Sequence, residues 1–127
     1  MSRKAAMLIV VDAANVVGSR PDGWWRDRAG AARRLLIRLS TLDLAQPAEV
    51  VVVLEGAAKA AASDEFDGVR VVLADGSGDD AIVDVVAAAS DEDTITVVTA
   101  DRGLRERIEA LGAASVGPRW LLDHIDP

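Results

Sequence analysis

Three aspartates stand where a parallel α/β sheet would bring them together. Asp12 directly follows an apolar run at 7–11, Asp79 opens the segment after another strand-like run, and Asp101 follows a run at 94–99. Open α/β sheets bind ligands in the crevice beyond the carboxyl ends of their strands. We therefore expect the three carboxylates to converge there, within metal-bridging distance.

Such a group of carboxylates predicts a metal site. Like charges in one crevice repel each other unless they are protonated or bound to a cation. The chain has no cysteine and one histidine, His124, so the available ligands are oxygen atoms, which suit Mg²⁺ or Mn²⁺. A metal of this kind polarises a phosphoryl oxygen and lowers the pKa of an attacking water. The residues therefore predict metal-assisted hydrolysis of a phosphodiester bond.

The expected mechanism needs no covalent intermediate. Asp12 and Asp101 would hold the principal metal, and Asp79 with Asp80 would complete the site. Without Cys, and with one distant His, the chain lacks the acid and base pair that a metal-independent ribonuclease uses to form a 2′,3′-cyclic phosphate. The products should therefore carry 5′-phosphate and 3′-hydroxyl ends.

Each aspartate also has a plainer interpretation as a helix cap. An N-cap Asp accepts hydrogen bonds from backbone N–H groups and stabilises a helix by about 1 kcal/mol without doing any chemistry. Asp79 and Asp101 both stand at expected N-cap positions. Capping does not account for Asp12 with Asn15, or for three acids at one sheet edge, so their joint placement favours the metal site.

The elements that must position these residues alternate along the chain. Strands are expected at 7–11, 49–55, 69–74 and 94–99, with a short edge strand at 115–117. Helices are expected at 27–42, 79–89, 102–111 and 119–125, with a loop at 16–25. This alternation predicts one domain over 1–127: a three-layer α/β/α sandwich with a mainly parallel sheet of four to five strands.

Composition agrees with one small domain. Of the 127 residues 50% are hydrophobic but 3% aromatic, so Val, Leu, Ile and Ala must build the core. No run approaches the roughly 18 apolar residues of a membrane helix, and the apolar run at the start of the chain stops at Asp12. We expect a cytoplasmic protein with no membrane partner and no small organic cofactor.

Charge is strongly polarised. The net charge is -7, yet residues 1–38 carry eight Lys or Arg against three acids, whereas residues 39–127 carry six against eighteen. Arginines on the helix at 27–42 could contact RNA phosphates, and two loop tryptophans could stack on bases. The plainer interpretation is that the arginines only face solvent and the tryptophans only cover an edge of the core. The candidate RNA-binding residues are Trp24, Trp25, Arg26, Arg33, Arg34 and Arg38.

Four sequence blocks, in order, resemble the YacP-like NYN domains of the PIN-like nuclease superfamily. The segment DAANVVGSRP at 12–21, followed by Arg26, Asp27 and Ala29, is similar to that family's D-x-x-N-x-x-G motif and R-D-x-A helix start. VVLEG at 52–56, SGDDAI at 77–82 and VTAD at 98–101 match the later blocks. The resemblance runs over nearly the whole chain.

The resemblance implies a PIN-like fold and a divalent-metal endoribonuclease that acts on RNA, free or on the ribosome. Asp12, Asp79 and Asp101 fall on the family's metal-binding acids, and Asn15 and Thr99 on its asparagine and threonine. The chain departs from the family pattern at two positions: Glu55 stands where an Asp is usual, and Val83 where a Glu often follows.

Two other functions are compatible with parts of the sequence. Residues 78–84 resemble a late block of haloacid-dehalogenase-like phosphatases, but those enzymes need an acid two residues after the nucleophile, and this chain has Ala14 there. The remaining alternative is a catalytically weak or inactive RNA- or ribosome-binding module with the same fold. Manganese-dependent cleavage of RNA separates that module from an active nuclease.

Overall fold

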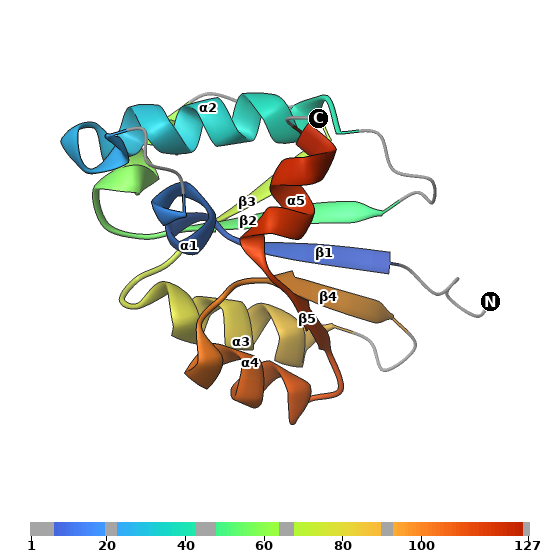
Figure 1. Ribbon diagram of the computed structural model, residues 1–127. Helices are drawn as coiled ribbons and strands as arrows, with labels where there is room; N and C mark the ends of the chain where they lie inside the picture. The colour runs from blue at the N-terminus through green and yellow to red at the C-terminus, as the bar shows by residue number, and fades with distance from the viewer. Residues whose placement is uncertain (1–6, 20–22, 43–47, 64–67, 90–92, 126–127) are drawn as a thin grey trace.

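A five-stranded parallel sheet forms the centre of the molecule (Figure 1). The computed structural model describes residues 7–19, 23–42, 48–63, 68–89 and 93–125. All four pairings of neighbouring strands are parallel, in the order β3-β2-β1-β4-β5. The strands are β1 (Met7–Asp12), β2 (Glu49–Leu54), β3 (Val69–Leu73), β4 (Thr94–Val98) and β5 (Ala114–Val116).

Helices cover both faces of this sheet, as the three-layer prediction requires. One face carries α1 (Ala13–Gly18), α2 (Arg28–Ser40) and α5 (Pro118–Ile125), together with the 3-10 segments η1 (Trp24–Arg26) and η2 (Gly56–Ser63). The other face carries α3 (Gly78–Ala88) and α4 (Arg102–Glu109). No helix in these ranges is both long and apolar enough to cross a bilayer.

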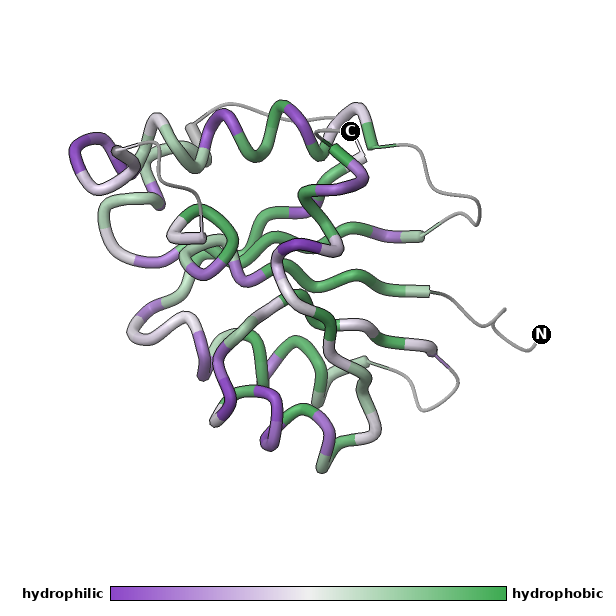
Figure 2. Tube along the Cα trace, viewed as in Figure 1, coloured by the Kyte–Doolittle hydropathy of each residue, from purple (hydrophilic) through white to green (hydrophobic). Residues whose placement is uncertain are grey.

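The core is two apolar layers divided by the sheet. Along β1, Ile9 and Val11 face the α2 side while Leu8 and Val10 face the α3 side, because successive strand residues point to opposite faces. A strand buried on both sides must be apolar throughout, and Figure 2 shows the hydrophobic colour continuing along the central strands. This is why the two central strands β1 and β2 appear in the sequence as unbroken apolar runs.

The order of the strands creates the crevice that the sequence predicts. From β1 the chain moves to β2 and β3 on one side, then returns to add β4 and β5 on the other. The order therefore reverses between β1 and β4, and ligands of such sheets bind at the carboxyl ends of the strands that flank this switch point. Asp12 ends β1, and residues 99–101 follow β4.

The predicted loop at 16–25 is wrong in its first part. Residues 13–18 form α1, so Val16 and Val17 are helical and Val16 is buried in the core. A single short turn carries too few apolar residues to show helical periodicity. Residues 20–22 of that loop lie outside the described residues, and Arg26 belongs to η1 rather than to the helix at 27–42.

The predicted cap of the helix at 79–89 is also wrong. Helix α3 begins at Gly78, and its N-cap is Ser77, whose hydroxyl oxygen accepts a hydrogen bond from the Asp80 N–H at 3.2 Å. Asp79 therefore lies inside the first turn. Its carboxylate is not used as a cap and is available to the sheet edge.

Candidate functional site

Asp12 and Thr99 form the buried centre of the site. Asp12 is 6% exposed and Thr99 is 0% exposed. The Thr99 hydroxyl donates to Asp12 Oδ2 at 2.9 Å and its oxygen accepts from the Asp101 N–H at 3.1 Å. One side chain therefore joins the ends of β1 and β4, the two strands that flank the switch point.

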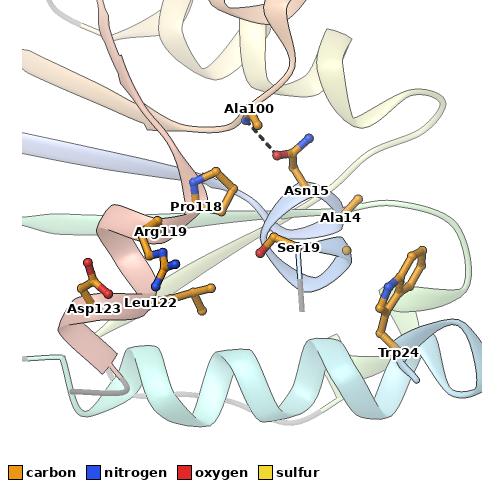
Figure 3. A pocket seen from close by; sticks show the side chains of 10 residues that line it. Ala14, Asn15, Ser19, Trp24, Ala100, Pro118, Arg119, Leu122 and Asp123 are labelled. Atoms are coloured by element: carbon orange, nitrogen blue, oxygen red, sulfur yellow. Dashed lines mark hydrogen bonds between the residues drawn. The ribbon is translucent and has the colours of Figure 1, made fainter. Parts of the chain in front are cut away.

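Asn15 makes a second connection across the same crevice. Its side-chain oxygen accepts a hydrogen bond from the Ala100 N–H at 2.8 Å (Figure 3). Its own backbone N–H donates to Asp12 Oδ1 at 3.4 Å, which makes Asp12 the N-cap of α1. The expectation that capping has no part in the role of Asp12 is therefore wrong, because the short helix α1 was not foreseen.

Asp101 caps α4, as the sequence predicts. Its Oδ1 accepts from the Leu104 N–H at 3.0 Å. The turn around it is further fixed by Arg105, whose Nε donates to the Thr99 carbonyl oxygen at 3.0 Å. The carboxylate of Asp101 thus combines a structural role with a position at the sheet edge.

Glu55 and Asp79 bring two more carboxylates to this edge. Glu55 follows β2, and its Oε2 accepts from the Gly78 N–H, the first residue of α3, at 2.6 Å. A Cβ on Gly78 would lie 3.1 Å from the Glu55 carboxyl carbon, so the glycine permits this close approach. Asp79, the next residue, is partly buried beside it.

Asp80 is not brought into this group. Its side chain is 70% exposed and its Oδ1 pairs with Arg107 on α4 at 2.9 Å. Successive helix residues point about 100° apart, so Asp79 and Asp80 cannot both face the same edge. The predicted metal-binding role of Asp80 is therefore not supported by its position.

The acids at this edge perturb one another. Burial raises the pKa of Asp12 to about 6; hydrogen bonds from Thr99 and Asn15 oppose that shift, and the charges of Asp79 and Glu55 add to it. The pKa of Asp79 is also raised, first by burial and then by the charges of Asp101 and Glu55. We call Asp12, Glu55, Asp79 and Asp101 the carboxylate cluster.

The chemistry of the carboxylate cluster fits a hard divalent cation. All its donors are oxygen atoms, and a cation would offset the burial and the like charges that raise the pKa of Asp12 and Asp79. Within the described ranges, however, no three His, Cys, Asp or Glu side chains form a ready-made metal group. The expected convergence of the three acids to metal-bridging distance is therefore not met in the part of the chain that the structure describes. Mg²⁺ commonly uses one or two carboxylates, with water and substrate oxygens as its other ligands.

A large hollow adjoins the carboxylate cluster. Its volume is about 810 Å³, and Asn15, Ala100, Trp24 and Arg119 are among the residues that line it (Figure 3). None of the four clustered acids lines it, so it lies beside them. Arg119 was missed by the sequence reasoning. It lies just beyond the carboxyl end of β5, and the strand-end rule that selected the aspartates could have found it.

The predicted RNA-binding side chains lie on the α2 side of the molecule. Trp24 is half-buried with the Arg28 guanidinium 5.4 Å from its ring centroid, and Trp25 is 56% exposed, edge-on to Trp24 at 6.1 Å. The remaining members are all exposed arginines, Arg26 on η1 and Arg33, Arg34 and Arg38 on α2.

Replacing Thr99 tests the centre of the site. Thr99→Val keeps the shape but leaves Asp12 without its hydroxyl donor and the Asp101 N–H without its acceptor. We expect a loss of about 2 to 3 kcal/mol in unfolding free energy. The loss should be larger above the Asp12 pKa of about 6 than below it, because the hydroxyl binds the ionised carboxylate more strongly.

Thr99→Ser is the matched control for that measurement. It keeps the hydroxyl, and we expect a loss of about 1 kcal/mol for the missing methyl group, with no dependence on pH. Chemical denaturation at two pH values measures both variants. Equal losses for Val and Ser would contradict the assigned hydrogen bonds.

Comparison with known proteins agrees with the geometry. The model of the YacP-like NYN domain family matches residues 9–127. Two crystal structures of Rae1 (YacP) from Bacillus subtilis, one of them of a point mutant, share the fold. Both are 20% identical to this chain and match 94% of it. The mutant structure has a TM-score of 0.77 with 74% of its own chain matched, and the other structure has a TM-score of 0.79 with 73% matched. No curated protein sequence matches. Since the family model covers nearly all of the chain, this protein belongs to the YacP-like NYN domain family, a family of nuclease-like domains.

Proposed function

We propose that this domain is an endoribonuclease that needs Mg²⁺ or Mn²⁺ and hydrolyses RNA phosphodiester bonds at the carboxylate cluster. The observation that carries the proposal is the burial of Asp12 among other acids at the switch point of the sheet. A buried carboxylate surrounded by like charges costs stability unless a cation or a proton joins it. Such a cost is typical of functional sites.

The residues of the crevice would divide into metal ligands and positioning residues. Asp12 and Asp101 would be the carboxylate ligands of the metal, and water and substrate oxygens would supply the others. Asp79 would add negative charge beside them, whereas Asp80 is left out because it pairs with Arg107. When bound, the metal would supply Lewis-acid stabilisation of the phosphoryl charge and a more acidic water. Thr99 orients Asp12, and Asn15 fixes the turn that carries Asp101.

Asn15 also has a donor to spare for the substrate. Its side-chain oxygen is used by Ala100, and among the described residues its amide nitrogen has no hydrogen-bond partner. Since Asn15 lines the hollow beside the carboxylate cluster, this nitrogen can donate to a phosphate or sugar oxygen there. We therefore assign Asn15 to both positioning and substrate binding.

The RNA itself would lie on the α2 side. Trp24 and Trp25 offer aromatic faces to bases, and Arg26, Arg33, Arg34 and Arg38 offer charge to phosphates. Their basic surface stands apart from the acids that dominate residues 39–127. This separation would let an anionic strand approach an acidic site.

Adding Mn²⁺ to protein stripped with EDTA tests the proposal. We expect cleavage of labelled RNA to appear, and the melting temperature to rise by a few degrees at about ten times the dissociation constant. Cleavage that is equal in EDTA would contradict metal dependence. RNA binding without cleavage under any divalent metal would favour the inactive binding module.

A further inference from the structure

A second hollow continues from the one beside the carboxylate cluster. It has a volume of about 180 Å³ and lies between α1, α2 and α5, with Leu35, Ile37 and Ile125 in its lining. Leu122 of α5 lines both hollows, so the two are neighbours that share a wall on that helix, and we call them together the groove. From Arg119 to Ile125 the helix rises about 9 Å, enough for two to three nucleotides of a stacked strand at about 3.4 Å each.

Cations line both parts of this groove. Arg119 lines the first hollow, and Arg34 and Arg38 line the second. Arg38 is fixed there, since its guanidinium donates to the Ile125 carbonyl oxygen at 3.4 Å. One acid, Asp123, also lines the first hollow.

Arg119 and Arg34 differ from three of the cations near the carboxylate cluster. Lys59 donates to the Ala74 carbonyl, Arg105 to the Thr99 carbonyl, and Arg107 pairs with Asp80. Arg119 and Arg34 are exposed and have no hydrogen bond or ion pair in the part of the chain that the structure describes. Two uncommitted arginines beside a groove, in a chain of net charge -7, indicate an anionic ligand there.

We propose that the RNA strand runs from the carboxylate cluster along the groove between α2 and α5, where Arg119 binds the phosphate nearest the cluster and Arg34 binds one further along. This inference rests on the proposed function and gives its substrate a route. An extended polyanion suits the groove better than a small anion, because the groove joins two hollows and presents cations in both. Trp24, on the wall of the first hollow, faces the same strand and can stack on a base.

Binding of fluorescent, unstructured RNA to the full chain tests this route. The measurements use Asp12→Asn protein, so that the RNA stays intact, and compare Arg119→Gln and Arg34→Gln with Arg70→Gln. Arg70 is exposed on β3 near Glu49, at the amino end of the sheet. The Arg70→Gln substitution therefore removes one positive charge, as the groove variants do, but far from the groove. We expect each groove variant to weaken binding about three- to tenfold and to reduce the salt slope by about 0.7, the value for one phosphate contact on a single strand. Arg70→Gln should change neither.

A series of shorter RNAs then tests the order of the two contacts along the strand, with Arg119 nearer the carboxylate cluster than Arg34. The effect of Arg34→Gln should disappear on oligonucleotides too short to reach α2, while the effect of Arg119→Gln remains. Wild-type affinity and salt slope in both groove variants, with RNA still cleaved by the wild-type protein, would overturn the route and leave the nuclease standing. In that case the groove serves another partner, such as a protein segment. If the wild-type protein neither binds nor cleaves RNA, the proposed function fails and the route fails with it.

Discussion

Asp12→Asn should abolish RNA cleavage while the protein stays folded. Asparagine keeps the shape of the side chain and one oxygen that can accept from Thr99 or from the Asn15 N–H. It removes the charge that a divalent cation requires. Since such a metal supplies several kcal/mol of transition-state stabilisation, we expect cleavage to fall at least about a hundredfold, and the same for Asp101→Asn.

A matched control separates this effect from a general loss of negative charge. Glu49→Gln removes one carboxylate at the amino end of β2, opposite the carboxylate cluster. It should cleave RNA at the wild-type rate. Initial rates on labelled RNA, with circular dichroism to confirm folding, measure all three variants. Full activity in folded Asp12→Asn protein would show that the residue assignment is wrong.

The second large effect is on stability as a function of pH. Burial raises the pKa of Asp12 from 3.8 to about 6, so the folded protein holds this proton more tightly than the unfolded chain does. The stability that Asp12 contributes is therefore full below about pH 4 and is lost as the pH rises through about 6. In EDTA, the loss should be on the order of 2 to 3 kcal/mol by pH 8.

Asp12→Asn should remove most of that dependence and be more stable than the wild-type protein at pH 8. The pKa of Asp79 is raised in the same direction, so a smaller slope of the same sign should remain. Denaturant unfolding in EDTA across this pH range provides the measurement, and added Mn²⁺ should flatten the wild-type curve by replacing the proton. An unchanged slope in Asp12→Asn would mean that other carboxylates govern the pH dependence.

Much of this fold can be read from the sequence because the sheet is parallel and buried. Strands covered on both faces must be apolar, so β1 and β2 stand out as runs of Val, Ile and Leu, whereas β4 is recognised by its β-branched residues, Thr, Ile and Val. The same rule places the residue after each run at one edge. It correctly brought Asp12 and Asp101 to the crevice. Thr99, which only the family resemblance singled out, bonds to both acids there.

The details that the sequence could not supply depend on contacts between distant segments. Helix α1 is too short for a periodic pattern. Glu55 bonds to the Gly78 N–H across 23 residues, so a tertiary contact acts together with the local Ser77 cap to set the start of α3, and with it the position of Asp79. The pairing of Asp80 with Arg107 is of the same kind.

The ends of the RNA products test the central claim most directly. Wild-type protein in Mn²⁺ should leave 5′-phosphate and 3′-hydroxyl ends, because hydrolysis at the carboxylate cluster uses water as the nucleophile. Treatment of the products with a 5′-phosphate-dependent exonuclease, and labelling of their 3′ ends, distinguishes hydrolysis by water from cleavage that forms a 2′,3′-cyclic phosphate. Products that the exonuclease degrades, made only when the metal is present, are the predicted result. Cleavage that persists in EDTA, or 2′,3′-cyclic phosphate ends, would contradict it.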